Sequence, residues 1–139
     1  MTSFGKTSSK RIQTCNDELQ RLFLLVVRTY DCSILCGTRG KEAQTKAYES
    51  GNSSVQYPDS RHNKFPSDAV DIAPYPIDWG EEGSAEQRKK AIARFYHFAG
   101  YVKAKAEVLG IDIRWGGDWD GDNDFSDQSF DDLVHWETK

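Results

Sequence analysis

The chain has 139 residues, a length that suits one domain with one hydrophobic core, and we expect residues 1–139 to form a single domain. Its net charge of −4 gives no support to a nucleic-acid partner. The longest apolar run, from Leu22 to Val27, is far shorter than the roughly 20 residues that a membrane span needs. We therefore expect a folded protein that binds neither nucleic acid nor a membrane.

The N-terminal residues lack the apolar segment of a signal peptide, so we expect synthesis in the cytosol without an export signal. The basic residues in this region are interpreted as a solvated segment: Lys6, Lys10 and Arg11. The three cysteines form no CxxC pair, which favours a reduced protein. Cys32 and Cys36 lie in an apolar stretch and are predicted to be small core residues.

The first half of the chain predicts two helices and a strand. Asn16 is a plausible N-cap for a helix whose apolar residues recur at intervals of three and four. The short apolar run Cys32–Cys36 is typical of a buried strand. Residues 41–50 predict a second helix, which Gly51 ends.

The second half predicts one long helix among short strands. Residues 52–68 are polar and predicted to be irregular, and residues 69–73 form a strand. Ser84 and Gln87 have the spacing of a capping box, which predicts the start of a helix that Gly110 ends. Its expected buried stripe is Ile92, Phe95, Ala99, Val102, Ala106 and Leu109.

Strands are also expected at residues 111–115 and 133–137, on either side of a loop at 116–131. Together these elements predict an α+β fold, with a small antiparallel sheet packed against helices. The Asp-rich loop invites a calcium interpretation, but the glycine that an EF-hand needs at its sixth position is replaced by Asn123 or Phe125. We interpret residues 118–131 as a flexible acidic rim, and whether they bind a regulatory cation is left open.

Four residues could carry metal chemistry. A catalytic zinc takes about three protein ligands and leaves a position for water. His62 and Asp71 lie close in sequence, and His135 can supply a third ligand from a distant strand. Asp132 precedes His135 by three residues and could act as a general base. Small proteins commonly contain such residues, so the residue types alone do not establish a site; His97, off the apolar stripe of its helix, is expected not to be a ligand.

The order of the motifs is more specific. Ser60-x-His62, then Ala69-x-Asp71, then Asp132-x-x-His135-x-Glu137 resembles the zinc peptidases that include D-alanyl-D-alanine carboxypeptidases and phage L-alanyl-D-glutamate endopeptidases. The stretches that resemble the single-domain phage endolysins are Phe4-Gly5-Lys6, Cys36-Gly37-Thr38-Arg39, AVDIAPYPIDW and Gly116-Gly117-Asp118-Trp119. His62 and Asp71 are nine residues apart, against seven in the family pattern. This departure predicts a two-residue expansion of the loop between them, at little cost in closure entropy.

The resemblance implies roles for individual residues. It implies that His62, Asp71 and His135 bind one Zn²⁺ ion on the sheet, and that Asp132 is the catalytic acid/base. Arg39 matches an arginine near the substrate, where it could stabilise an oxyanion or pair with a carboxylate; a salt bridge with Glu42 is the alternative. Ser60 and Glu137 each have two possible roles. Ser60 binds substrate or fixes its loop, Glu137 orients a ligand histidine or is a solvated acid, and Trp136 is expected to pack.

The implied function is hydrolysis of an amide bond in the peptide stems of bacterial peptidoglycan, as a monomeric phage endolysin. The resemblance also implies that such an enzyme accumulates in the host cytoplasm and reaches the cell wall with the help of a holin. Two alternatives remain: a D-alanyl-D-alanine carboxypeptidase, and a non-catalytic cell-wall-binding or virion module on the same fold.

Overall fold

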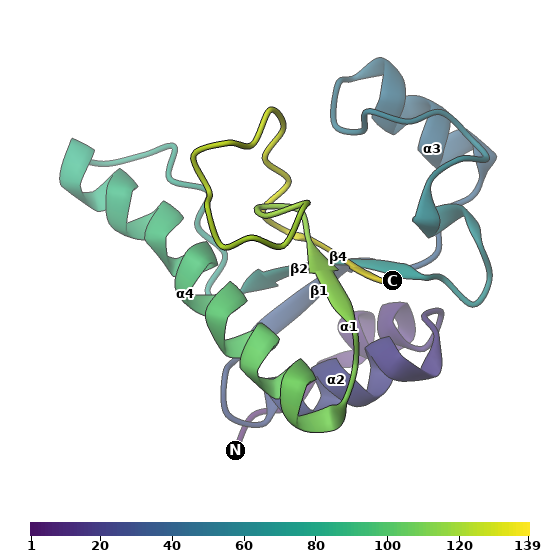
Figure 1. Cartoon of the computed structure of the whole chain (residues 1–139), viewed down its shortest axis with the longest axis horizontal. Coiled ribbons are helices and arrows are strands. Elements are labelled where there is room, and N and C mark those ends of the chain that lie inside the picture. Colours follow the sequence, from purple (N-terminus) through teal and green to yellow (C-terminus); the bar gives the residue numbers. More distant parts are fainter.

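The computed structural model describes residues 1–139 as helices packed on a four-stranded antiparallel sheet, so the prediction of an α+β fold is confirmed (Figure 1). In chain order the elements are α1 (Lys6–Ile12), α2 (Asp17–Val27), β1 (Cys32–Cys36), α3 (Lys41–Glu49), the 3₁₀ turn η1 (Arg61–Asn63), β2 (Ala69–Pro74), α4 (Ala85–Leu109), β3 (Ile113–Trp115) and β4 (His135–Thr138).

Two of the helices begin where their sequences predict, and α4 also ends as predicted. The side chain of Asn16 accepts a hydrogen bond from the Leu19 amide and caps α2. Ser84 and Gln87 form the predicted capping box at the start of α4. Gly110 ends α4 with a positive φ of 70°, a conformation that glycine adopts without steric cost.

The sheet has the strand order β1-β2-β4-β3. Asp71 of β2 lies directly opposite His135 of β4, and Glu137 of β4 lies between Ala69 and Arg114 of the two neighbouring strands. Because side chains alternate between the faces of a strand, Asp71, His135 and Glu137 share one face.

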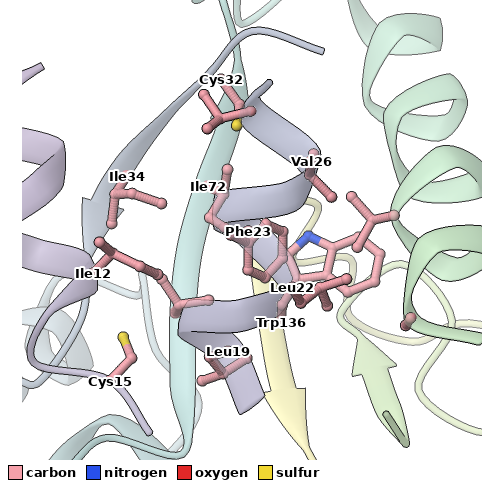
Figure 2. Close-up of a cluster of buried hydrophobic side chains, with 14 of the residues drawn as sticks. Ile12, Cys15, Leu19, Leu22, Phe23, Val26, Cys32, Ile34, Ile72 and Trp136 are labelled. Atoms are coloured by element: carbon pink, nitrogen blue, oxygen red, sulfur yellow. The ribbon is translucent and has the colours of Figure 1, made fainter. Parts of the chain in front are cut away.

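The opposite face of the sheet forms the hydrophobic core with α1, α2 and α4. Trp136 is fully buried there, as expected, and Figure 2 shows its ring beside α2 residues Leu22, Phe23 and Val26. The ring of Trp136 stacks on Trp115 of β3, with 5.8 Å between centroids. One face of the sheet therefore anchors it, and the other is free to carry polar residues.

Several local predictions were wrong. Residues 6–12 form helix α1, which was not predicted; Ile12 at its end is buried, whereas Lys6, Lys10 and Arg11 are exposed, as expected. Ile92 is exposed; the buried residues of α4 are Ala91, Phe95, Phe98, Ala99, Val102 and Ala106. The last two strands are shifted or shortened relative to the predicted bounds, because residues 111–112 and 133–134 lie outside the paired segments.

The polar face of the sheet lies between two segments. Figure 1 shows α3 standing apart from the other helices, with the yellow-green loop 116–131 on the other side of β2 and β4. The loop is irregular, as predicted. One of its acids does not belong to an exposed rim, because the Asp118 side chain is buried and forms an ion pair with Lys103 at 3.2 Å. No helix of the chain has the length and apolar character needed to cross a membrane.

Candidate metal centre

The structure brings the three predicted metal ligands together. Asp71 Oδ1 lies 3.2 Å from His62 Nε2 and 3.5 Å from His135 Nδ1. The two imidazole rings meet edge to face, with centroids 5.1 Å apart. Both imidazole rings thus face the same carboxylate oxygen on the polar face of the sheet.

The outer nitrogen of each ring is held by an acceptor. His62 Nδ1 donates to the backbone carbonyl of Gly37 at 2.7 Å, and His135 Nε2 donates to Glu137 Oε1 at 2.8 Å. Because the outer nitrogens donate to these acceptors, the inner nitrogens, Nε2 of His62 and Nδ1 of His135, face Asp71. They donate to Asp71 when the rings are protonated and offer lone pairs to a metal when the rings are neutral. The donor set therefore fits a divalent metal that accepts nitrogen and oxygen ligands.

Local structure explains how His62 reaches this point. Ser60 caps η1 and its hydroxyl accepts a hydrogen bond from the His62 amide. The His62 carbonyl in turn accepts from the Arg39 amide at 2.7 Å. Of the two interpretations of Ser60, the structure shows that it fixes the loop, and the residue also lines the cleft described below.

The longer spacing between His62 and Asp71 is absorbed at the surface. Residues 64–66 of the connecting segment are exposed, whereas the backbone of Ser67 pairs with Thr14 and Asn16. The extra residues therefore bulge outward while both ends of the segment remain fixed.

The cluster favours positive charge between its donors. Burial by itself would raise the pKa of Asp71, but hydrogen bonds with His135 and His62 hold it well below the usual range. Burial opposes protonation of His62, yet the hydrogen bond to Asp71 raises its pKa to about 10. The pKa of His135 is also raised against its burial, by Asp71 and Glu137. The carboxylates of Asp71 and Glu137 therefore stabilise positive charge on the two imidazole rings.

Asp132 lies beside the three donors. Asp132 forms a group with Asp71 and His135 in which one carboxylate oxygen of each acid and one ring nitrogen of the histidine lie within 4.8 Å of one another. The backbone of Asp132 is fixed by the Gly116 carbonyl at 2.9 Å and by the His135 amide at 3.1 Å. Burial, and then the negative charge of Asp71, raise the pKa of Asp132 to about 6, which suits a group that takes up and returns a proton near neutral pH.

Arg39 is held against the cluster. Its Nη2 donates to Asp71 Oδ2 at 3.2 Å and its Nη1 to Gln44 Oε1 at 3.0 Å. The alternative partner Glu42 pairs with Lys46 instead. The observed contacts make Arg39 a residue that orients Asp71, so that the other carboxylate oxygen faces the histidines.

The prediction that Cys36 is a core residue was wrong. Its thiol belongs to a group with His62 and Asp71 whose ligand atoms all lie within 4.8 Å. Burial alone would raise the pKa of Cys36, but His62 and Arg39 lower it. Cys15 and Cys32 are buried, and burial raises the pKa of each thiol to about 12. Sequence distance hid the neighbours of Cys36, because β1 pairs with β2 beside Asp71.

A cleft of about 900 Å³ opens over the cluster. Its walls come from α3 and the segment after it, and from the loop 116–131, which contributes Trp119 and Phe130. The ring of Trp119 packs against that of His135, with 5.3 Å between the ring centroids. Glu137 is buried in the cleft wall rather than solvated, and His97 is exposed and bonded to Tyr30.

Outside this cleft, Asp118, Asp120 and Asp122 also lie within 4.8 Å of one another, and two of the three are exposed. Acidic loop residues often gather in this way without an ion. The cluster of His62, Asp71 and His135 is different because it is buried, an acceptor lies behind each ring, and it opens into the cleft. Such a combination on an α+β fold is typical of metal-dependent hydrolases.

Comparison with known proteins agrees with a hydrolase. The chain matches the model of the phage L-alanyl-D-glutamate peptidase family over residues 1–138, and it belongs to that family. It is 32% identical over 130 residues to the L-alanyl-D-glutamate peptidase of Escherichia phage T5, covering 90% of this chain and 87% of the relative. Its fold is similar to that of the L-Ala D-Glu endopeptidase ChiX of Serratia marcescens, with a TM-score of 0.68 and 22% identity over 99% of this chain and 90% of that one.

Proposed function

We propose that the protein is a zinc peptidase that hydrolyses the L-alanyl-D-glutamate bond in the peptide stems of bacterial peptidoglycan. The observation that carries the proposal is that His62 and His135 both face the Oδ1 atom of Asp71 within a cleft, in a chain that belongs to the phage L-alanyl-D-glutamate peptidase family. As a phage endolysin it would act as a monomer, accumulate in the host cytoplasm and reach the wall through a pore formed by a holin.

In this proposal His62, Asp71 and His135 hold a single Zn²⁺ ion. When bound, the ion would polarise the scissile carbonyl and acidify a water molecule. The support lies in the geometry of the chain itself: each histidine is oriented by an acceptor behind its ring, and Asp71 is oriented by Arg39.

Asp132 is the proposed acid/base. It lies beside His135 and Asp71, and its pKa of about 6 lets the carboxylate accept a proton from water and return it to the leaving amine. Arg39 is the proposed catalytic arginine: it holds Asp71, and its guanidinium lines the cleft, where a donor can stabilise the developing oxyanion. Ser60 is proposed to line the substrate position as well as capping η1.

The cleft suits an extended peptide better than a compact molecule. Its volume of about 900 Å³ lies at the upper end of the range for small-molecule pockets, and its walls carry both aromatic and charged side chains. An endopeptidase needs room on both sides of the scissile bond, whereas a carboxypeptidase needs only one.

The test is digestion of purified peptidoglycan with and without EDTA, followed by mass analysis of the fragments. We expect clearing that EDTA abolishes and zinc restores, with new L-alanine carboxyl ends and free D-glutamate amines. Release of free D-alanine alone would identify a carboxypeptidase. Bound zinc without any fragments would identify a binding module, and both results would contradict the proposal.

A further inference from the structure

Two arginines share a single carboxylate next to the metal cluster. Arg61 Nε lies 2.8 Å from Glu137 Oε2, and Arg114 Nη1 lies 3.3 Å from the same oxygen. The other oxygen of Glu137 accepts from His135. The two guanidinium groups are thus linked to the proposed metal ligand His135 through the Glu137 carboxylate.

At this corner of the cleft two guanidinium groups share one carboxylate. One carboxylate cannot neutralise two guanidinium groups, and no other acid forms an ion pair with either arginine. The Glu137 side chain is 8% exposed, whereas those of Arg61 and Arg114 are 42% and 35% exposed, and both arginines line the cleft. Arg114 Nε is buried without any hydrogen-bond partner.

Arg39 differs from this pair. Its side chain is only 15% exposed, and its hydrogen bonds go to Asp71 and Gln44. Arg61 and Arg114 are therefore more exposed to the cleft than Arg39, and Arg39 already donates to two protein acceptors.

The chemistry of the proposed substrate supplies a matching anion. Glutamate has two carboxyl groups, and only one of them can continue the peptide chain. The other is free, lies within a few bonds of the scissile nitrogen, and is ionised at neutral pH. A planar carboxylate is the group that paired guanidinium donors bind best.

We propose that Arg61 and Arg114 form a subsite that binds the free carboxylate of the D-glutamyl residue and so select the residue on the leaving side of the scissile bond. The proposal rests on the peptidase function proposed above. Glu137 then has two roles. It orients His135, and it holds both arginines where they can bind the substrate carboxylate.

The test compares two stem peptides that differ in one group: the free carboxylate of D-glutamate, or its amide. For the wild-type enzyme we expect kcat/KM on the carboxylate peptide to exceed that on the amide by about ten- to a hundredfold, the usual range for charge-assisted hydrogen bonds. In Arg61→Gln and Arg114→Gln most of this preference disappears, because the rate falls on the carboxylate peptide and changes little on the amide.

Each variant is checked for zinc content and melting temperature, since Glu137 also holds His135. Arg114→Lys keeps a charge and is expected to keep part of the preference. Arg21→Gln, an exposed change on α2 outside the cleft, is the matched control and should discriminate like the wild type.

Equal rates on the two peptides in the wild type would overturn the subsite. An equal fall on both peptides in the arginine variants would also overturn it, because it would show a purely structural role. Failure of the wild type to cut either peptide would instead refute the proposed peptidase, so the two failures are distinguishable.

Discussion

The histidines of the metal cluster differ from His97 in what surrounds their rings. His62 and His135 are buried and each has an acceptor behind the ring, whereas His97 is exposed on α4. We expect His135→Ala to lower bound zinc from about one equivalent to less than about a tenth, because two ligands hold zinc poorly. His97→Ala should keep full zinc content. Metal analysis after gel filtration measures both, and full occupancy in His135→Ala would remove it from the ligand set.

Asp132 is a neighbour of the ligand cluster rather than one of the three proposed ligands. We expect Asp132→Asn to retain zinc and to lose at least about a hundredfold in turnover, because an amide cannot accept the proton. Asp131→Asn, an exposed change at the adjacent position, is the control and should retain near-normal activity. Rates on a defined stem peptide, together with zinc content, decide the matter: near-normal turnover in Asp132→Asn would exclude it from the mechanism.

At this scale the sequence predicted the residues whose spacing forms a motif and missed those that only the fold brings in. His62, Asp71, Asp132 and His135 could be named from their order in the chain. Cys36, and the Gly37 carbonyl behind His62, could not, because nothing in sequence links β1 to residues 62 and 71. Pairing of β1 with β2 creates those contacts.

At the scale of elements, the turn after β3 fixes the position of Asp132. A Cβ at Gly116 would clash with the Asp132 carbonyl oxygen and would lie 2.9 Å from the Asp132 Cβ. We expect Gly116→Ala to displace Asp132, to lower activity at least about tenfold and to cost about 1–3 kcal/mol of stability. Zinc content is measured as well, because the Gly116 amide also donates to the His135 carbonyl at 2.8 Å.

Gly100→Ala is the matched control for this variant. A Cβ there meets nothing within 4 Å, and alanine is favoured over glycine in a helix by up to about 1 kcal/mol. Activity assays and denaturant unfolding of the two variants test the argument. Normal activity in Gly116→Ala would show that the turn does not position the acid.

Asp118 joins the loop 116–131 to α4. Burial by itself would raise its pKa, but the Asn123 amide and Lys103 lower it below the usual range. Its contribution to stability is therefore present above about pH 4, where the unfolded chain is ionised, and is lost as the pH falls through the lower pKa of the folded protein.

We expect Asp118→Asn to be less stable than the wild type by about 1–3 kcal/mol at pH 7, with a gap that narrows below about pH 4. Urea unfolding across this range measures the gap, with Asp127→Asn, an exposed residue of the same loop, as the control. A gap that stays constant with pH would assign the effect to packing instead of charge.

Helix ends with capping residues were predictable, and elements held by tertiary contacts were not. The capping residues of α2 and α4 lie directly before each helix and could be recognised in the sequence. α1 has no side-chain cap and is stabilised where Ile12 packs into the core. The stripe of α4 begins at Ala91 rather than Ile92, because the helix face that meets the sheet is set by its neighbours and not by hydrophobicity alone.

At the scale of the whole molecule, the proposed metal would join η1, β2 and β4. Ligand binding to the folded state adds stability according to its affinity, about 2.7 kcal/mol at a hundred times Kd. We expect EDTA to lower the melting temperature by about 10 °C and zinc to restore it. Calorimetry measures the shift. His135→Ala should show little response to EDTA, and an equal response there would point to a metal bound elsewhere.

The pairing of Asp71 with His135 across β2 and β4 has a consequence for preparing the protein. A slip of one residue between these strands would turn one of the two side chains to the opposite face of the sheet, and the ligand set would be broken. A refolded sample can contain compact molecules with wrong strand pairing that resemble the native protein by size and helix content. Zinc stoichiometry would count only molecules in the native register, and could thus serve as a quality measure for material recovered from inclusion bodies.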